Sequence, residues 1–141
     1  MKIAIHRGTK EIGGSCVEIG SDSTTILVDF GLPISFEFDD DIKSVLPEPI
    51  FSNIITGKKK IGALLLSHAH LDHFGLVEAL PNRIPVFLGK ATGELIQFND
   101  KFTPNRAKIQ NQNFIEDKVP ISIGDLEITP YQMDHSAFDA F

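Results

Sequence analysis

The feature that most constrains the fold is an apolar run, residues 61–66, which leads directly into a cluster of histidine and aspartate residues. A strand that is buried on both faces of a sheet has such an almost continuous apolar pattern. The segment that follows holds His68, His70, Asp72 and His73, although the whole chain has only five histidines. Neutral imidazole and carboxylate are ligands that suit Zn²⁺ and related divalent ions. The sequence therefore predicts a buried strand that ends in a metal-binding loop.

The spacing within this cluster predicts two metal ions. A loop that leaves a strand can turn His68 and His70 toward one point, and the next turn, at the start of a helix near His73, can present Asp72 and His73 to a second point. Two ions about 3.5–4 Å apart can clamp both oxygens of a displacement, and water on such an ion has a pKa of about 7. N–H groups at the start of the helix would favour an anionic substrate such as a phosphate ester. We therefore expect a hydrolase site.

The rest of the chain alternates between strand and helix patterns, so the predicted fold class is mixed α and β. The first three strands are separated by short turns and are expected to form an antiparallel meander, with Ile3 and Ile5 on the buried face of the first strand. Gly124 and Asp125 have the pattern of a two-residue hairpin turn. Residues 30–56 are expected to be loop with one short helix. The expected strands are residues 3–5, 16–19, 24–29, 61–66, 84–88, 119–123, 126–129 and 131–133, and the expected helices are residues 76–80 and 90–102, the latter with an apolar face of Leu95, Phe98 and Phe102.

Composition limits the class of protein. The chain has 141 residues, of which 42% are hydrophobic and 23% charged, a balance typical of one globular domain. Its formal net charge of -6 argues against a protein that holds nucleic acid by bulk charge alone. It does not exclude a nuclease in which metal ions contact the phosphate.

The same sequence predicts a cytoplasmic protein without membrane contact. The N-terminal residues become polar too soon for a signal peptide, and no apolar stretch approaches the roughly 18 residues of a membrane span. The single cysteine, Cys16, excludes an internal disulfide and is expected to be a buried, inert thiol. His6 is expected to be structural or exposed, and Asp134 and Asp139 to be solvated loop carboxylates.

Residues 68–73 resemble the HxHxDH signature of the metallo-β-lactamase fold superfamily. Residues 6–14, 27–31 and 134–136 resemble the ribonuclease J-like, beta-CASP-related branch, of which the chain is similar to the N-terminal part only. The resemblance implies an αββα sandwich, of which this chain supplies the first half and the start of the second. It implies one metallo-β-lactamase-like domain over residues 1–141 that is incomplete at its C-terminal end.

The resemblance also implies roles for single residues. His68, His70 and His135 would bind one metal ion, and Asp72 and His73 the other. Asp72 and His135 would act in catalysis. Zn²⁺ is the expected ion, with Mn²⁺ as the alternative. Asp29, at the end of a strand, would support the metal loop, and Ser136 would contact a substrate phosphate; a plain turn aspartate is the alternative for Asp29.

The function implied is that of a zinc-dependent hydrolase of phosphodiester bonds in RNA, acting in RNA processing. Two alternatives stay open. One is a hydrolase of small thioesters or lactones, because one fold hosts many chemistries. The other is a non-catalytic metal-binding fragment, because the aspartate that bridges the two metals in the family has no counterpart here. An uncovered inner face of the half-sandwich is further expected to promote self-association.

Overall fold

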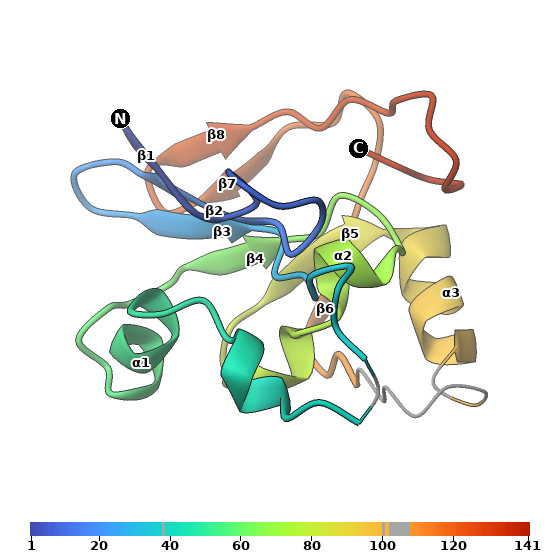
Figure 1. Ribbon diagram of the computed structural model, residues 1–141. Coiled ribbons are helices and arrows are strands. Elements are labelled where there is room, and N and C mark those ends of the chain that lie inside the picture. Colours follow the sequence, from blue (N-terminus) through green and yellow to red (C-terminus); the bar gives the residue numbers. More distant parts are fainter. Residues whose placement is uncertain (38, 100, 102–107) are drawn as a thin grey trace.

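The computed structural model describes residues 1–37, 39–99, 101 and 108–141. Within these residues, six strands form one sheet in the order β1-β2-β3-β4-β5-β6 (Figure 1). The first three strands are antiparallel, and β3, β4, β5 and β6 are parallel. The strands are β1 (Lys2–Arg7), β2 (Cys16–Gly20), β3 (Thr25–Val28), β4 (Ala63–Leu65), β5 (Val86–Gly89) and β6 (Gln112–Ile115).

The antiparallel meander predicted at the N-terminus is confirmed. Ile3 pairs with Ile19, and Ile19 pairs with Ile26 in the next strand. The expectation that Ile3 and Ile5 are buried is wrong, because their exposed fractions are 64% and 55%. β1 is the edge strand of the sheet, and no described segment covers this part of its face.

Helices cover the other face of the sheet (Figure 1). Residues from β3 and β4, such as Leu27 and Leu64, pack there against residues from the helices, such as Ile54 and Phe74, and all four are almost fully buried. The helical elements are the 3₁₀ helices η1 (Ile42–Val45) and η2 (Val77–Ala79) and the α-helices α1 (Ile50–Ile55), α2 (Leu71–Phe74) and α3 (Lys90–Asn99). None of the helices in the described part of the chain is long and apolar enough to cross a membrane.

A hairpin begins a third layer on the opposite side of the sheet. β7 (Ile121–Ile123) and β8 (Leu126–Ile128) pair antiparallel around the predicted two-residue turn, where Gly124 has a φ of 60°. Ile123 of this hairpin is buried against Ile26 and Ala63 of the large sheet. Helices, sheet and hairpin thus follow one another as layers, and the predicted mixed α and β class is confirmed.

Three expectations about single elements are wrong. Residues 131–133 do not continue the strand before them, since β8 ends at Ile128 and no strand follows it in the described residues. β6 was not expected, since Gln112–Ile115 begins with two polar residues. The helix expected at residues 76–80 is a 3₁₀ turn, and the α-helix next to it, α2, begins earlier at Leu71.

The expected apolar face of α3 is also wrong. Leu95 and Phe98 have exposed fractions of 41% and 58%, whereas Thr92, Gly93 and Ile96 are the buried residues of the helix. Gly93 packs closely on β6: a Cβ atom on it would lie 2.9 Å from the Oε1 atom of Gln112. The buried face of α3 thus consists of two small residues, Thr92 and Gly93, and Ile96. Phe102, the third residue of the expected face, lies outside the described residues.

Candidate metal centre

The candidate site lies where the parallel strands β3 and β4 end. Val28 and Leu65 pair at the ends of these strands. Asp29, the first residue after β3, and Ser67, the second residue after β4, therefore come close together. Asp29 has a φ of 59°, and its N–H donates to the Leu65 carbonyl at 2.8 Å. This left-handed conformation, which aspartate tolerates better than most residues, turns the buried carboxylate toward the loop after β4.

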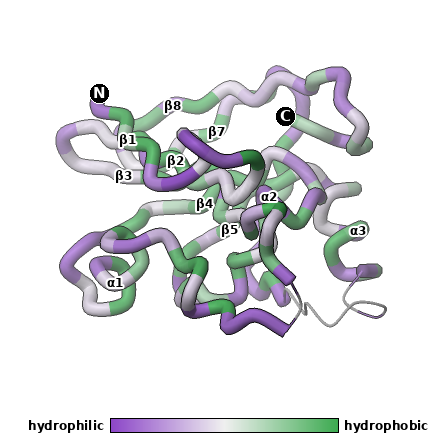
Figure 2. Tube along the Cα trace, viewed as in Figure 1, coloured by the Kyte–Doolittle hydropathy of each residue, from purple (hydrophilic) through white to green (hydrophobic). Residues whose placement is uncertain are grey.

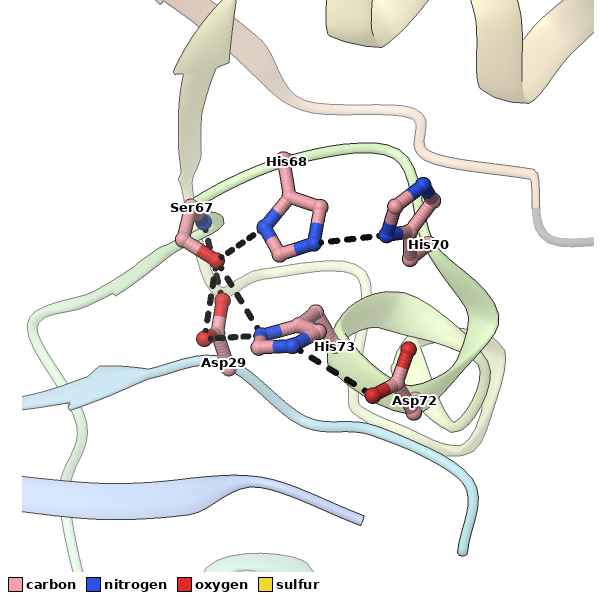
Figure 3. Close-up of polar contacts among 6 residues, drawn as sticks. All are labelled: Asp29, Ser67, His68, His70, Asp72 and His73. Atoms are coloured by element: carbon pink, nitrogen blue, oxygen red, sulfur yellow. Dashed lines mark hydrogen bonds and ion pairs between the residues drawn. The ribbon is translucent and has the colours of Figure 1, made fainter. Parts of the chain in front are cut away.

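The carboxylate of Asp29 connects β3 to this loop (Figure 3). Its Oδ1 atom accepts a hydrogen bond from the Ser67 N–H at 2.8 Å, and its Oδ2 atom accepts one from the Ser67 hydroxyl at 3.0 Å. His73 approaches the same Oδ2 atom with Nδ1, at 2.7 Å. The structure thus brings Asp29 to the position expected of a supporting residue.

Ser67 and Asp29 determine which ring nitrogens carry hydrogen. The Ser67 hydroxyl donates to Asp29, so it accepts from Nδ1–H of His68, 2.9 Å away. Since a neutral imidazole carries one hydrogen, Nε2 of His68 keeps its lone pair. The Asp29 carboxylate, which can only accept, likewise takes a hydrogen bond from Nδ1–H of His73. Ser67 was not among the expected site residues, although its place between the strand and His68 would have been a signal.

His68, His70 and His135 come together although they are far apart in sequence. One ring nitrogen from each lies within 4.8 Å of the ring nitrogens of the other two. Nε2 of His68 is 3.0 Å from Nδ1 of His70, and the ring centroids of His68 and His135 are 4.5 Å apart. His68 is buried, His70 is half-buried and His135 is exposed. These three residues could hold one divalent ion.

The pKa of His68 is lowered to about 4. Burial is the largest cause, and the nearby rings of His73, His70 and His135 lower it further because their positive charge would repel a second one. His68 is therefore neutral at neutral pH, the state in which imidazole binds a metal.

Asp72 and His73 form a second group beside the first. Oδ2 of Asp72 lies 3.5 Å from Nε2 of His73, and the rings of His68 and His73 are 4.0 Å apart between centroids. Burial lowers the pKa of His73, but the hydrogen bond and charge of Asp29, with the charge of Asp72, outweigh burial and raise it. Oδ2 of Asp72 and Nε2 of His73 thus lie close together on one side of α2.

α2 is held in place by backbone contacts from other segments. The N–H groups of Ser15, Phe30 and Leu32 donate to the carbonyls of Asp72, His73 and Leu71 at distances of 3.0, 2.8 and 3.0 Å. The helix expected to begin near His73 is α2. α2 begins at Leu71, and the N–H groups of His73 and Phe74 already donate to the His70 carbonyl.

An open cavity of about 350 Å³ adjoins both groups. Asp29, His68, His73 and His135 contribute to its wall, together with the segment near Phe141. Asp134 also lies in this wall. Ser136 is exposed and is not one of the residues that line the cavity.

The other polar candidates have different environments. Asp139 is not solvated as expected, because its carboxylate accepts hydrogen bonds from the first turn of α3. Cys16 is fully buried, as expected, and burial raises its pKa to about 12. His6 is half-buried and lies 3.0 Å from the carboxylate of Glu18, as expected of a structural histidine.

Fold and side chains together place the chain in the class of metallo-hydrolase-like α/β domains. The chain belongs to the metallo-beta-lactamase superfamily, whose family model matches residues 9–130. The resemblance seen in residues 68–73 is thereby confirmed.

Similar proteins agree with this family. The chain is 28% identical to a ribonuclease J of Helicobacter pylori over 99% of its own length and 20% of the relative. It is 30% identical to a probable RNase of Methanocaldococcus jannaschii over 90% of its own length and 27% of the relative. A subclass B3 metallo-beta-lactamase from a soil metagenome library superimposes with a TM-score of 0.65 at 20% identity, over 91% of this chain and 49% of that one. The chain thus spans about a fifth to a quarter of the curated relatives.

Proposed function

We propose that the chain carries the metal-binding part of a metal-dependent ribonuclease that cleaves phosphodiester bonds in RNA. The observation that carries this proposal is the convergence of ring nitrogens from His68, His70 and His135 within 4.8 Å. The names of the two ribonuclease relatives, which match nearly the whole chain, support RNA as the substrate.

The donor atoms fit two zinc ions. His68, His70 and His135 would hold the first ion through ring nitrogens, and Asp72 and His73 would hold the second through an oxygen and a nitrogen. Imidazole and carboxylate are ordinary zinc ligands, and the histidine-rich set favours zinc over manganese. The neutral state of His68 supports this fit, because a protonated ring could not bind a cation.

The residues of the chain would prepare the site in separate ways. When bound, the two ions would supply an activated water as the nucleophile and positive charge next to the phosphate. Asp29 and Ser67 would fix the rings of His68 and His73 by the hydrogen bonds described above. Asp72 would complete the second group, and the exposed His135 would border the substrate at the open side of the cavity.

The net charge of the chain supports a substrate that is held at the metal centre rather than over a wide surface. With a net charge of -6, the chain would not attract RNA by bulk charge, so the contact with phosphate would depend on the metal centre. The hydroxyl of Ser136, next to His135, is a candidate for a further contact with phosphate. A single domain over residues 1–141 and a cytoplasmic location, which fits the reduced Cys16, are parts of the same proposal.

The test is metal content per chain by elemental analysis, on protein purified without added metal. We expect about one zinc or more per chain, lost in His68→Ala and in His135→Ala and retained in His6→Ala, a matched histidine outside the site. No metal in a chain shown to be folded would contradict the proposal for this chain.

Activity separates the substrate classes. A labelled RNA and a small thioester or lactone are offered to the metal-loaded chain and to His68→Ala. Cleavage of RNA alone, lost in the variant, supports the ribonuclease. Hydrolysis of the small ester alone supports the other enzyme class, and metal binding without either activity supports a non-catalytic fragment.

A further inference from the structure

His135 lies on a segment without regular structure. β8 ends at Ile128, and no helix or strand is present in residues 129–141. His68 and His70, by contrast, directly follow the buried strand β4. The position of the exposed His135 side chain therefore depends on contacts between residues 129–141 and other parts of the chain.

The segment is closed into a loop next to the metal-binding loop. The Met133 N–H donates to the Ala140 carbonyl at 2.9 Å, which closes residues 133–140. The Phe141 N–H donates to the Ser67 carbonyl at 3.0 Å, which joins the end of this loop to the residue before His68. We call residues 133–140 the His135 loop.

Asp139 attaches the His135 loop to the start of α3. Its Oδ2 atom accepts hydrogen bonds from the N–H groups of Ala91, at 2.8 Å, and Thr92, at 3.3 Å. The hydroxyl of the fully buried Thr92 donates to the Asp139 carbonyl at 3.2 Å. N–H groups in the first turn of a helix have no partner within the helix, and a carboxylate there also interacts well with the helix dipole.

The surroundings leave little freedom to Asp139. Its φ of 66° is one that most side chains avoid and that aspartate and asparagine tolerate better. A Cβ atom on Gly89, the last residue of β5, would lie 2.1 Å from Oδ2 of Asp139. A glycine at the end of the strand thus makes the close approach of the carboxylate possible.

We propose that Asp139 is a positioning residue, which anchors the His135 loop to α3 and thereby holds His135 beside His68 and His70. The proposal rests on the proposed metal centre. Asp139 acts through His135 and does not contact the ion, because Oδ2 is occupied by two N–H groups and Asp139 is not part of the group of converging ligand atoms.

The test compares two substitutions of one residue by metal titration. Asp139→Ala removes the acceptor, and we expect the Kd for Co²⁺ or Zn²⁺ at the first ion to rise about 10-fold or more. Asp139→Asn keeps an oxygen acceptor and the tolerance for positive φ, and asparagine caps helices as well as aspartate does. We expect its Kd to stay within about threefold of the wild-type value. In the double variant with His135→Ala, Asp139→Ala should add no further loss, since both changes remove the same ligand.

A control separates this role from a general loss of stability. Ile50→Val alters the core on the helix side of the sheet, away from the site. The variants are compared at conditions in which the same fraction of each is folded. Ile50→Val should then bind the metal with the wild-type Kd, whereas Asp139→Ala should still bind it more weakly.

A second readout needs no metal. Hydrogen exchange at the amides of Met133 and Phe141 reports the two bonds that hold the His135 loop. We expect both amides to lose protection in Asp139→Ala and to keep it in Asp139→Asn and in His68→Ala.

The outcomes distinguish the two proposals. Wild-type metal affinity in Asp139→Ala overturns the role of Asp139 while the metal centre stands. Unchanged protection of both amides in Asp139→Ala also overturns it. If the wild-type chain binds no metal, the proposed metal centre is overturned. If the amides of Met133 and Phe141 nevertheless lose protection in Asp139→Ala, the anchoring of the His135 loop by Asp139 is supported.

Discussion

At the scale of single residues, Asp29 is the main group that raises the pKa of His73. Burial lowers the pKa of His73, and the hydrogen bond and charge of Asp29 raise it. In Asp29→Asn the favourable charge is gone while burial remains, so the pKa of His73 in the metal-free chain should fall below its wild-type value. NMR titration of the histidine ring signals measures this pKa.

The control for this prediction is Asp72→Asn. Asp72 is the lesser contributor, because its Oδ2 atom is 3.5 Å from Nε2 of His73 whereas Oδ2 of Asp29 is 2.7 Å from Nδ1. The pKa should therefore fall less than in Asp29→Asn. If the pKa of His73 falls equally in both variants, or does not fall in Asp29→Asn, the contact with Asp29 is not what raises this pKa.

Gly31 is the residue at which a single methyl group should displace both Asp72 and His73. A Cβ atom there would lie 1.7 Å from the carbonyl oxygen of Asp72 and 2.7 Å from the backbone nitrogen of His73. Backbone must move to admit it, and we expect Gly31→Ala to lower the free energy of unfolding by about 3 kcal/mol. Urea denaturation of the metal-free chain measures this.

Gly20→Ala is the matched control. Its added Cβ would lie 3.6 Å from the nearest atom, an ordinary contact, so the free energy of unfolding should change by less than about 1 kcal/mol. Similar losses in both variants would mean that the contact with α2 is unimportant for stability.

The candidate site could be predicted only as far as local spacing determines it. His68, His70, Asp72 and His73 are close in sequence, so one loop brings them together whatever the rest of the chain does. Ser67 and Asp139 could not be assigned in this way. Their contacts depend on the pairing of β3 with β4 and on the position of residues 133–140 beside the start of α3. Neither of these follows from a run of neighbouring residues.

At the scale of elements, Glu18 joins β1, β2 and the turn after α1. Its carboxylate lies 3.0 Å from Nε2 of His6 and 2.5 Å from Nζ of Lys59, and its side chain is largely buried. Burial raises the pKa of Glu18, but hydrogen bonds with Lys59 and His6 outweigh burial and lower it below its ordinary value of 4.5.

The sign of this shift gives a pH dependence. A carboxyl whose pKa is lower in the folded chain contributes stability above its unfolded pKa and loses it as the pH falls through the folded pKa. Glu18→Gln should therefore lower the free energy of unfolding by about 1–2 kcal/mol at pH 7, and the difference from the wild type should shrink below about pH 4.5. Urea denaturation over this pH range measures it, with Glu78→Gln as an exposed control. A difference that does not depend on pH would contradict the role of the charge.

The elements that could be predicted are those whose side chains follow the period of their own structure. β2, β3 and the β7–β8 hairpin have apolar residues in the strand pattern or a glycine at the turn. α3 turns another face to the core than expected, because Thr92, Gly93 and Ile96 are buried while Leu95 and Phe98 are exposed. Only the close packing of α3 on β6 shows why small residues are buried there.

At the scale of the whole molecule, the two faces of the sheet differ in cover. Helices bury one face, whereas the β7–β8 hairpin packs on the other face against Ile26 and Ala63 and leaves their neighbours on the sheet, Ile19, Leu65 and Phe87, only partly buried. Figure 2 shows that hydrophobic residues continue along β1 at the edge of the sheet. Ile3 and Ile5 are exposed there, and an edge strand also presents unpaired backbone groups.

This uncovered edge leads us to expect self-association of the 141-residue chain. Contact between two copies along β1 would bury Ile3 and Ile5 and pair the free backbone groups of both edges. Sedimentation velocity should show a mass that increases with concentration, and Ile3→Lys should shift the chain toward the monomer, because a lysine on an edge strand opposes pairing. Ile34→Lys replaces an isoleucine of similar exposure, 65%, outside the sheet and should leave association unchanged. A wild-type chain that is monomeric at every concentration would show that its exposed edge does not drive association, and equal effects of both lysines would assign the association to net charge.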